Sequence, residues 1–334
     1  MTRVTGFLVA LGGANHIYTP VLFGESRVQG VITGVLMILG GITAVYVGAR
    51  MSRFGRRHTA RLIKDPGGLE PGSYILYLRP FELDHQLYGI RPDPSRNPVR
   101  RLQSPLSRTF EEDLVLTLRW RLGKVVAVGS PGERLPRVGA RRFYLPTVWK
   151  PTVSSLIGTA RLVVLATGTT EGTLWELTEC VRLLPPERLM LVVFTNRADY
   201  GRFRSAAQDS FASRAAELEG PQAARLSAFR LPDHPPLKNP AVAARAVGTQ
   251  GLITFGPGWE PQFVRLDPTA VRAVTDLGRL RAMMRRQVHP TLREVKRRLA
   301  EAPEIPPARN AGPSVPPPGA AADDDHGTAA PRTE

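Results

Sequence analysis

The chain has few of the residues on which several common kinds of site depend. A single cysteine, Cys180, occurs in 334 residues, which excludes a disulfide framework and a cysteine-rich zinc module. The six histidines are scattered without metal-ligand spacing, so we expect no metal site. Aromatic residues make up only 7% of the chain and no recognition module is visible, which disfavours nucleic acid as a partner. The Walker lysine motif, the GxGxxG fingerprint and the GxSxG nucleophile motif are also missing.

Acidic residues are scarce relative to basic ones. The chain has 45 Lys and Arg against 29 Asp and Glu, a formal net charge of +16. With nucleic acid disfavoured, this excess favours an anionic membrane surface as the partner. Apolar residues make up 42% of the chain, which excludes wholesale disorder.

Two stretches near the N-terminus have no Asp, Glu, Lys or Arg. They cover residues 4–24 and 28–49, and each is long enough to cross a bilayer, which takes about 20 apolar residues. A cleaved signal peptide would have a shorter apolar core and a small-residue cleavage site. Residues 1–49 therefore predict a two-helix transmembrane hairpin, in contact with the lipid bilayer.

A basic cluster follows the second stretch, in a juxtamembrane linker that we place at residues 50–72. Basic flanks stay on the cytoplasmic side, so both ends of the hairpin are expected inside the cell. The protein is then expected in the inner (plasma) membrane as a multi-pass protein with a cytoplasmic domain. The cluster either only sets this topology or also binds anionic lipid headgroups. Its members are Arg50, Arg53, Arg56, Arg57, Arg61 and Lys64.

Residues 73–220 have the pattern of an α/β domain. Short apolar runs typical of strands alternate with amphipathic helical patterns, which predicts a parallel sheet. Because the strand runs are apolar throughout, we expect helices on both faces of the sheet. The strand runs cover 74–78, 125–128, 162–166 and 189–195, and the helical patterns cover 109–122, 152–160, 172–184 and 200–219.

Ligands of such sheets bind beyond the carboxyl ends of the strands. This rule selects the loops at 79–81, 129–132 and 167–172. The third loop leads into a helix whose free N–H groups suit a phosphate. The alternative is that Gly168 and Gly172 only shape a turn and that Thr173 caps the helix. Cys180, inside that helix, is interpreted as a packing residue rather than a nucleophile.

Residues 73–220 resemble a divergent bacterial form of the Toll/interleukin-1 receptor (TIR) domain. The run YILYLRPFELD at 74–84 is similar to the family's opening strand, YDVFISYxxxD. The run VVLATGTTEGTLWELTE at 163–179 is similar, without gaps, to VVLLSPxYxxSxWCxxE, with Trp175 and Glu179 in register. The sequence departs from the family at 79–80 and 167–168, and it has an Arg- and Pro-rich insertion at 85–108. The resemblance implies a flavodoxin-like sheet.

Some TIR domains cleave the bond between nicotinamide and ribose in NAD, and the Glu of the WxxxE motif is essential there. The resemblance thus implies Glu179 as the catalytic acid and NAD as the substrate, with no metal or other cofactor required. Glu176, on nearly the same helix face, is the rival acid. We expect Arg79 to hold a pyrophosphate or carboxylate and Phe81 to stack on a ring. The expected ligand-binding residues are Arg79, Phe81, Gly129, Gly132, Thr167, Gly168, Thr169 and Trp175.

Two other functions remain open. Many TIR domains only assemble, so the protein is alternatively a non-enzymatic adaptor at the inner membrane face, forming homo-oligomers through this domain. Glu179 would then be an ordinary exposed helix acid that pairs with Arg182. A nucleotide-sugar transferase is disfavoured, because the α/β region contains no Asp-x-Asp motif.

Residues 221–301 form a C-terminal extension. Two strand patterns, at 252–255 and 263–266, predict a hairpin that either extends a sheet edge or covers a pocket with Trp259. A basic amphipathic pattern at 269–300, with a break expected at Pro290, predicts a helix. It lies on the inner leaflet or packs on the α/β domain. Residues 302–334, rich in Pro, Ala and Asp, predict a disordered tail.

Overall fold

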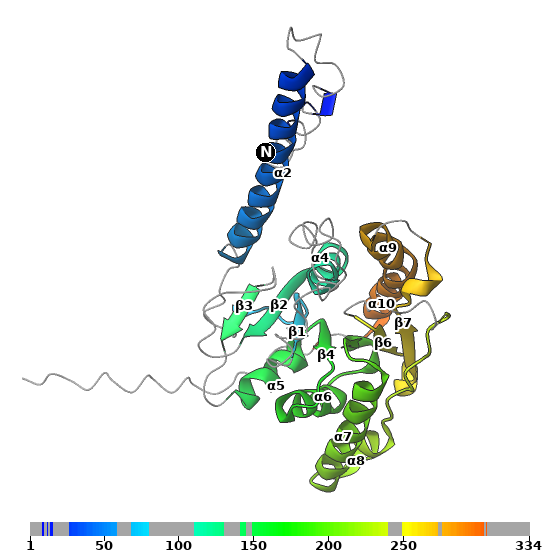
Figure 1. Ribbon diagram of the computed structural model, residues 1–334. Coiled ribbons are helices and arrows are strands. Elements are labelled where there is room, and N and C mark those ends of the chain that lie inside the picture. The colour runs from blue at the N-terminus through cyan, green and yellow to red at the C-terminus, as the bar shows by residue number, and fades with distance from the viewer. Residues whose placement is uncertain are drawn as a thin grey trace, which may run out of the picture.

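A seven-stranded sheet forms the centre of the α/β domain (Figure 1). A computed structural model describes residues 27–58, 68–79, 110–129, 141–144, 149–239, 249–272 and 276–303, together with 9, 12, 14, 15 and 305. The strand order is β3-β2-β1-β4-β5-β6-β7. All pairs from β3 to β5 are parallel, and β6 and β7 are antiparallel to their neighbours. The predicted α/β class with a mostly parallel sheet is therefore confirmed.

The strands lie where the apolar runs predicted them, with one addition. The predicted strands are β1 (Tyr74–Leu78), β2 (Lys124–Gly129), β4 (Leu162–Ala166), β5 (Leu189–Val193), β6 (Gly251–Phe255) and β7 (Pro261–Arg265). The sequence analysis missed the edge strand β3 (Arg141–Tyr144), which pairs with β2. A four-residue strand that begins with two arginines has no apolar run to reveal it.

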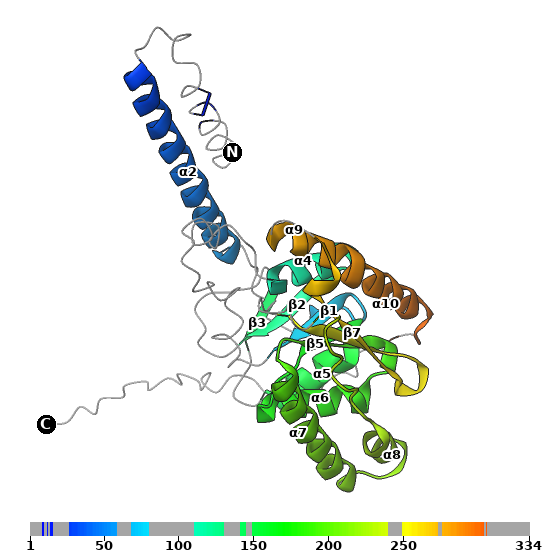
Figure 2. The ribbon, with the colours of Figure 1, turned by 45° about the vertical axis from the view of Figure 1, so that its right-hand side comes forward.

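Helices cover both faces of the sheet, as the continuous apolar strands predicted (Figure 2). One face carries α5 (Lys150–Thr159), α6 (Glu171–Leu183), α7 (Arg197–Ala216) and α8 (Gly220–Ala228). The other carries α4 (Phe110–Leu122), α9 (Asp276–Met283) and α10 (His289–Glu301). Alternate residues of β1 point to opposite layers: Leu76 packs toward α5 and α6, whereas Tyr77 packs toward α4. Burying each such apolar side chain contributes about 1.5–3 kcal/mol.

The C-terminal extension belongs to this same sheet and core. The hairpin of β6 and β7 pairs with β5, so it extends the sheet edge as predicted. Leu292 and Val295 of α10 are buried in the second layer. The amphipathic helix therefore packs on the α/β domain, and the alternative in which its apolar stripe lies in the inner leaflet is wrong.

The break expected at Pro290 takes the form of a π-helical segment, Met284–Val288, between α9 and α10. Proline has no N–H to donate to the preceding turn, and a widened turn accommodates that loss. Pro290 thus lies in the first turn of α10.

The N-terminal helix α2 runs from Arg27 to His58. Its segment Val28–Gly48 is long and apolar enough to cross a membrane, with a mean hydropathy of 2.1. Most of the first predicted span, 4–24, lies outside the described residues, so the structure shows one candidate span and not the predicted pair. The helix also continues through much of the predicted linker and takes in the first four arginines of the basic cluster. Arg61 and Lys64, the insertion at 85–108 and most of the tail lie outside the described residues.

Gly251 at the start of β6 provides a test of this packing. A Cβ there would lie 2.1 Å from Cε1 of Phe263, whose ring packs against Tyr200 and His234. We expect Gly251→Ala to destabilise the protein by about 1–3 kcal/mol, because the ring has little room to move. Gly201→Ala, in α7 with nothing within 4 Å, should instead stabilise by about 0.5–1 kcal/mol. Denaturant unfolding of the full chain measures both changes, and equal effects would contradict the packing.

Candidate functional site

The order of the strands places the candidate site at the carboxyl ends of β1 and β4. The chain passes from β1 to β2 in one direction and from β4 to β5 in the other, so these two central strands flank the switch point. Arg79 directly follows β1 and is only 8% exposed. Thr167 and Gly168 directly follow β4 and are buried, whereas Thr169 is exposed. The structure therefore brings Arg79 and the 167–169 loop to one edge.

Three other predicted site residues have different outcomes. Gly129 is the last residue of β2, so it also lies at the carboxyl edge, one strand beyond β1. Phe81 and Gly132 lie outside the described residues.

The N-terminus of α6 is capped by Thr170, not by Thr173 as predicted. The Thr170 hydroxyl oxygen accepts a hydrogen bond from the backbone N–H of Thr173 at 3.3 Å, and the two hydroxyls are 2.9 Å apart. This cap satisfies one of the free N–H groups with which a helix N-terminus binds phosphate.

Trp175 faces α5 and has a packing role. Its ring lies edge-on to the ring of Trp149, with centroids 4.9 Å apart, and the Lys150 ammonium lies 5.7 Å from its centroid. An edge-to-face pair of this kind contributes about 0.5–1.5 kcal/mol beyond the area it buries. These contacts pack Trp175 against α5, and its expected part in ligand binding stays a prediction.

Glu179 is a buried ion-paired acid. Arg182 donates two hydrogen bonds to its carboxylate, from Nε at 2.8 Å and from Nη2 at 2.6 Å, and the Ser154 hydroxyl donates a third. Burial by itself raises the pKa of Glu179, but the bonds from Arg182 and Ser154 outweigh it and lower the pKa. The predicted pair with Arg182 is confirmed, whereas the expected exposure is wrong because the residue is 3% exposed. The hydrogen bond from Ser154 ties α6 to α5.

Glu176 has the opposite environment. It is 8% exposed, and its carboxyl group forms no hydrogen bond with the rest of the described chain. Burial raises the pKa of Glu176 to about 8, so the carboxyl group is mostly protonated at neutral pH. The residue lies on the second turn of α6, about 8 Å along the axis from the helix start at the carboxyl edge.

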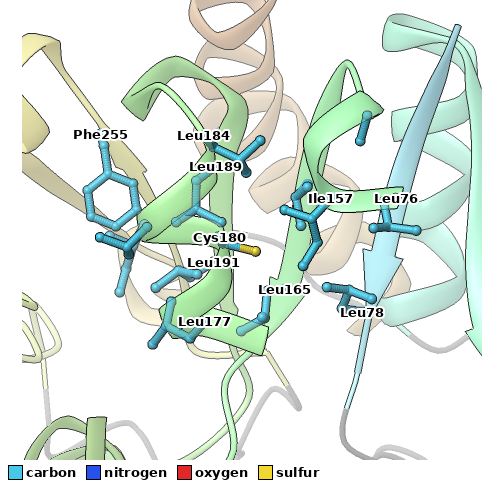
Figure 3. Packing of buried hydrophobic residues seen from close by; sticks show 14 of the residues in the cluster. Leu76, Leu78, Ile157, Leu165, Leu177, Cys180, Leu184, Leu189, Leu191 and Phe255 are labelled. Atoms are coloured by element: carbon cyan, nitrogen blue, oxygen red, sulfur yellow. The ribbon is translucent and has the colours of Figure 1, made fainter. Parts of the chain in front are cut away.

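Cys180 is a core residue. It is fully buried among aliphatic side chains that include Leu165, Leu177 and Leu191 (Figure 3). Burial, together with the nearby Glu176 and Glu179, raises the pKa of the thiol well above its ordinary value. A protonated, enclosed thiol is not a nucleophile, so the interpretation of Cys180 as a packing residue is confirmed.

Sequence reasoning missed a second group of polar residues at the carboxyl edge. Within the described part of the chain, four buried polar atoms have no hydrogen-bond partner, and three are Thr195 Oγ1, Thr249 Oγ1 and Arg265 Nε. Thr195 follows β5, whereas the predicted strand had included it. Thr249 precedes the antiparallel β6, and Arg265 ends β7, paired with Gly251. Buried donors without partners are rare in proteins and commonly bind water or a ligand.

The fourth such atom, Nε2 of His234, lies near this group. The imidazole packs against the rings of Tyr200 and Phe263, with centroids 5.6 and 5.4 Å away. Burial, followed by the positive charge of Arg265, lowers the pKa of His234, so the ring is neutral at pH 7. Only Thr195 carried a signal in the sequence, since it is the last residue of a predicted strand. The other three residues come from distant segments that the fold brings together.

Trp259 does not cover this edge. It lies in the turn between β6 and β7, at the opposite end of the sheet, so a pocket that it covers lies away from the sheet-end loops. There it packs against Phe229 and Phe255 and lines a shallow pocket of about 340 Å³ between α8 and the hairpin. Among the described residues, no three His, Cys, Asp or Glu side chains are grouped so as to hold a metal ion.

The two acids of α6 should change stability with pH in opposite directions. Burial raises the folded pKa of Glu176 to about 8. The contribution of this group to the free energy of unfolding is therefore full below the unfolded pKa of 4.5 and is lost as the pH rises through 8. The folded pKa of Glu179 is lowered, so its contribution is present above 4.5 and is lost as the pH falls through the folded pKa.

We therefore expect Glu176→Gln to gain stability relative to the wild type as the pH rises from about 5 to about 9. Glu179→Gln should lose about 2–4 kcal/mol at neutral pH, with a smaller deficit in acid, because it breaks a buried ion pair. Thermal unfolding of the full chain across this range measures both trends. If the stabilities of the two variants relative to the wild type changed with pH in the same direction, the opposite pKa shifts of Glu176 and Glu179 would be contradicted.

No protein-family model matches this chain, and no curated protein is significantly similar to it. The physical arrangement of its side chains is therefore the basis for the function proposed below.

Proposed function

We propose that this protein is a membrane-anchored α/β protein that binds a nucleotide along the carboxyl edge of its sheet, on the cytoplasmic side. The observation that carries the proposal is the set of buried donor atoms without a partner: Thr195 Oγ1, Thr249 Oγ1 and Arg265 Nε. The other two nitrogens of the Arg265 guanidinium group donate to Gln250, which holds the group at this edge. The three donor atoms share an edge with Arg79 and Thr167, and the row crosses β1, β4, β5, β6 and β7. At the usual strand spacing it extends about 19 Å, which suits an extended nucleotide better than a single small ion.

The anchor is supported by the surface of α2. Large apolar side chains in the candidate span are exposed, among them Ile32 at 54%, Leu36 at 63% and Leu39 at 56%. Lipid is the environment that would cover them. The four arginines that follow within α2 place its C-terminal end on the cytoplasmic side. A Cβ on Gly12 would lie 3.5 Å from Met37, which favours a second span beside the first and hence a multi-pass anchor.

A flavodoxin-like, TIR-like fold is supported by the strand order β2-β1-β4-β5. The chain runs outward from β1 to β2 and on to the additional edge strand β3, and it then crosses to β4 on the other side of β1. Helices follow β1, β4 and β5, as that fold requires. The departure is β6, which occupies the next position in the sheet but runs antiparallel. The resemblance favours NAD as the nucleotide.

Glycosidic cleavage of NAD would depend on Glu176 rather than Glu179. Positive charge develops on the ribose in the transition state, and a nearby carboxylate stabilises it. The Glu179 carboxylate already accepts three hydrogen bonds, which positions α5 against α6. Glu176 has none from the described residues, and a bound cationic nicotinamide group would favour its ionised form.

The second candidate is a non-enzymatic adaptor with the same anchor and the same nucleotide-binding edge. It is favoured by the burial of both acids, at 8% and 3% exposure, which keeps them from solvent and from a substrate in the free protein. Nucleotide binding would then regulate assembly of the domain into homo-oligomers.

Substitution of the unpartnered hydroxyls tests the binding edge. Thr249→Val should weaken NAD binding about fivefold to tenfold, because it removes one hydrogen bond to the ligand. Calorimetry on the full chain in nanodiscs measures this affinity. Its stability should be unchanged or higher, since the hydroxyl has no partner in the free protein. Thr178→Val is the matched control, because that hydroxyl bonds Ser210 and Leu174 away from the edge. It should lower stability and leave binding unchanged.

Two outcomes would contradict the binding edge. No detectable binding of NAD or ATP by the wild type would overturn nucleotide binding itself. Binding that Thr249→Val leaves unchanged would overturn its placement at this edge.

Release of nicotinamide distinguishes the enzyme from the adaptor. If the protein is a glycohydrolase, chromatography of NAD incubated with the full chain should show nicotinamide, and Glu176→Gln should abolish it. Glu179→Gln should keep measurable activity at temperatures where it remains folded. Binding without release, including after clustering of the protein, would establish the adaptor.

A further inference from the structure

Trp120 is the most exposed large apolar side chain in the described part of the chain. It lies in the last turn of α4 and is 87% exposed, between the exposed Arg119 and Arg121. A tryptophan flanked by basic residues is typical of segments at the interface between lipid headgroups and acyl chains, where its ring is partly apolar and partly polar.

Trp120 lies at the end of the sheet where the chain enters the domain from the membrane anchor. Lys124, four residues later, is the β2 partner of Tyr74 at the start of β1. The chain reaches Tyr74 from His58, the end of α2, through fifteen residues. Even fully extended, they span at most about 50 Å. Trp120 therefore lies at the sheet edge that the anchor tethers.

The surface beside Trp120 is strongly basic. A hydrogen bond of 3.2 Å between Arg121 Nη2 and His289 Nδ1 joins α4 to α10, and both helices lie in one layer (Figure 2). Residues 276–301 of that layer contain eight Arg and Lys against three Asp and Glu. Residues 197–228, which form α7 and α8 on the opposite face, contain five against four. The exposed members are Arg281, Arg285, Arg286, Arg293, Lys296 and Arg297.

We propose that the layer of α4, α9 and α10 docks on the anionic leaflet next to the anchor, with Trp120 inserted among the headgroups. This inference rests on the proposed membrane anchorage. The tether keeps the layer near the bilayer, so weak contacts suffice, and each basic residue near an anionic surface adds to the attraction. Only the basic rim and the Trp120 ring contact lipid, because the apolar stripe of α10 is buried in the core.

Docking sets the orientation of the domain. The sheet then lies roughly along the membrane, with α5 to α8 facing the cytoplasm. The carboxyl edge with Arg79 and Thr249 stays open at the side, because it lies between the two helical layers and not beneath α10.

Tryptophan fluorescence tests the proposal on the full chain in nanodiscs. All four tryptophans, at 120, 149, 175 and 259, lie in the α/β domain, so the anchor adds no signal. Brominated lipids quench a tryptophan that enters the interface. We expect quenching about threefold stronger with about 30% anionic lipid than with zwitterionic lipid alone. The difference should vanish in Trp120→Phe, which should fold normally because the side chain is exposed.

Charge reversal provides the matched control. Arg285→Glu with Arg286→Glu should abolish the lipid-dependent quenching, whereas Arg202→Glu with Arg204→Glu, on α7, should leave it unchanged. Equal quenching in the wild type and Trp120→Phe would overturn docking. An absence of quenching in discs that carry the protein would also overturn docking, but it would leave the proposed membrane anchorage intact. Failure of the protein to co-elute with the discs would overturn the anchorage, and the docking with it.

Discussion

The described domain depends on the burial of β1 and β4 on both faces. Every residue of these two strands is buried, and the strands occupy the centre of the sheet. A sheet with two apolar faces requires two layers of helices. The segments between the central strands contribute too few helices to cover both faces. The C-terminal helices α9 and α10 complete the second layer. For this reason the apolar stripe of α10 faces the sheet and only its basic side faces outward.

The same two-layer arrangement gives the two acids of α6 different properties. Glu176 and Glu179 are three residues apart, and both are buried. The neighbouring helix α5 offers Ser154 to Glu179, and the next turn of α6 offers Arg182, so Glu179 is ionised. No described residue offers a donor to Glu176, so its carboxyl group is mostly protonated at neutral pH. The chemistry available to each acid follows from its neighbours and not from its place in a motif.

The central strands and the helices between them were predictable because their hydrophobic periodicity is strong. The predicted strand 162–166 coincides with β4, and 74–78 coincides with β1. Short elements were less predictable. The strand β3 is an edge strand without an apolar run, and the cap of α6 was hard to assign because three of the five residues at 169–173 are threonines. The continuation of α2 to His58 was missed because charge, rather than helix propensity, had defined the linker.

The sequence by itself determined the fold class, the apolar span at 28–48 and the loops that end at the carboxyl edge, because periodicity and composition are local properties. The tertiary structure alone decided which distant groups meet there. Thr195, Thr249 and Arg265 converge only because β6 and β7 fold back antiparallel on β5. It also decided that both acids of α6 are buried and that Ser154 of α5 bonds to Glu179, whereas the Glu179–Arg182 pair follows from its local spacing. Burial and bonds between elements depend on contacts between segments that lie far apart along the chain, and no local pattern encodes them.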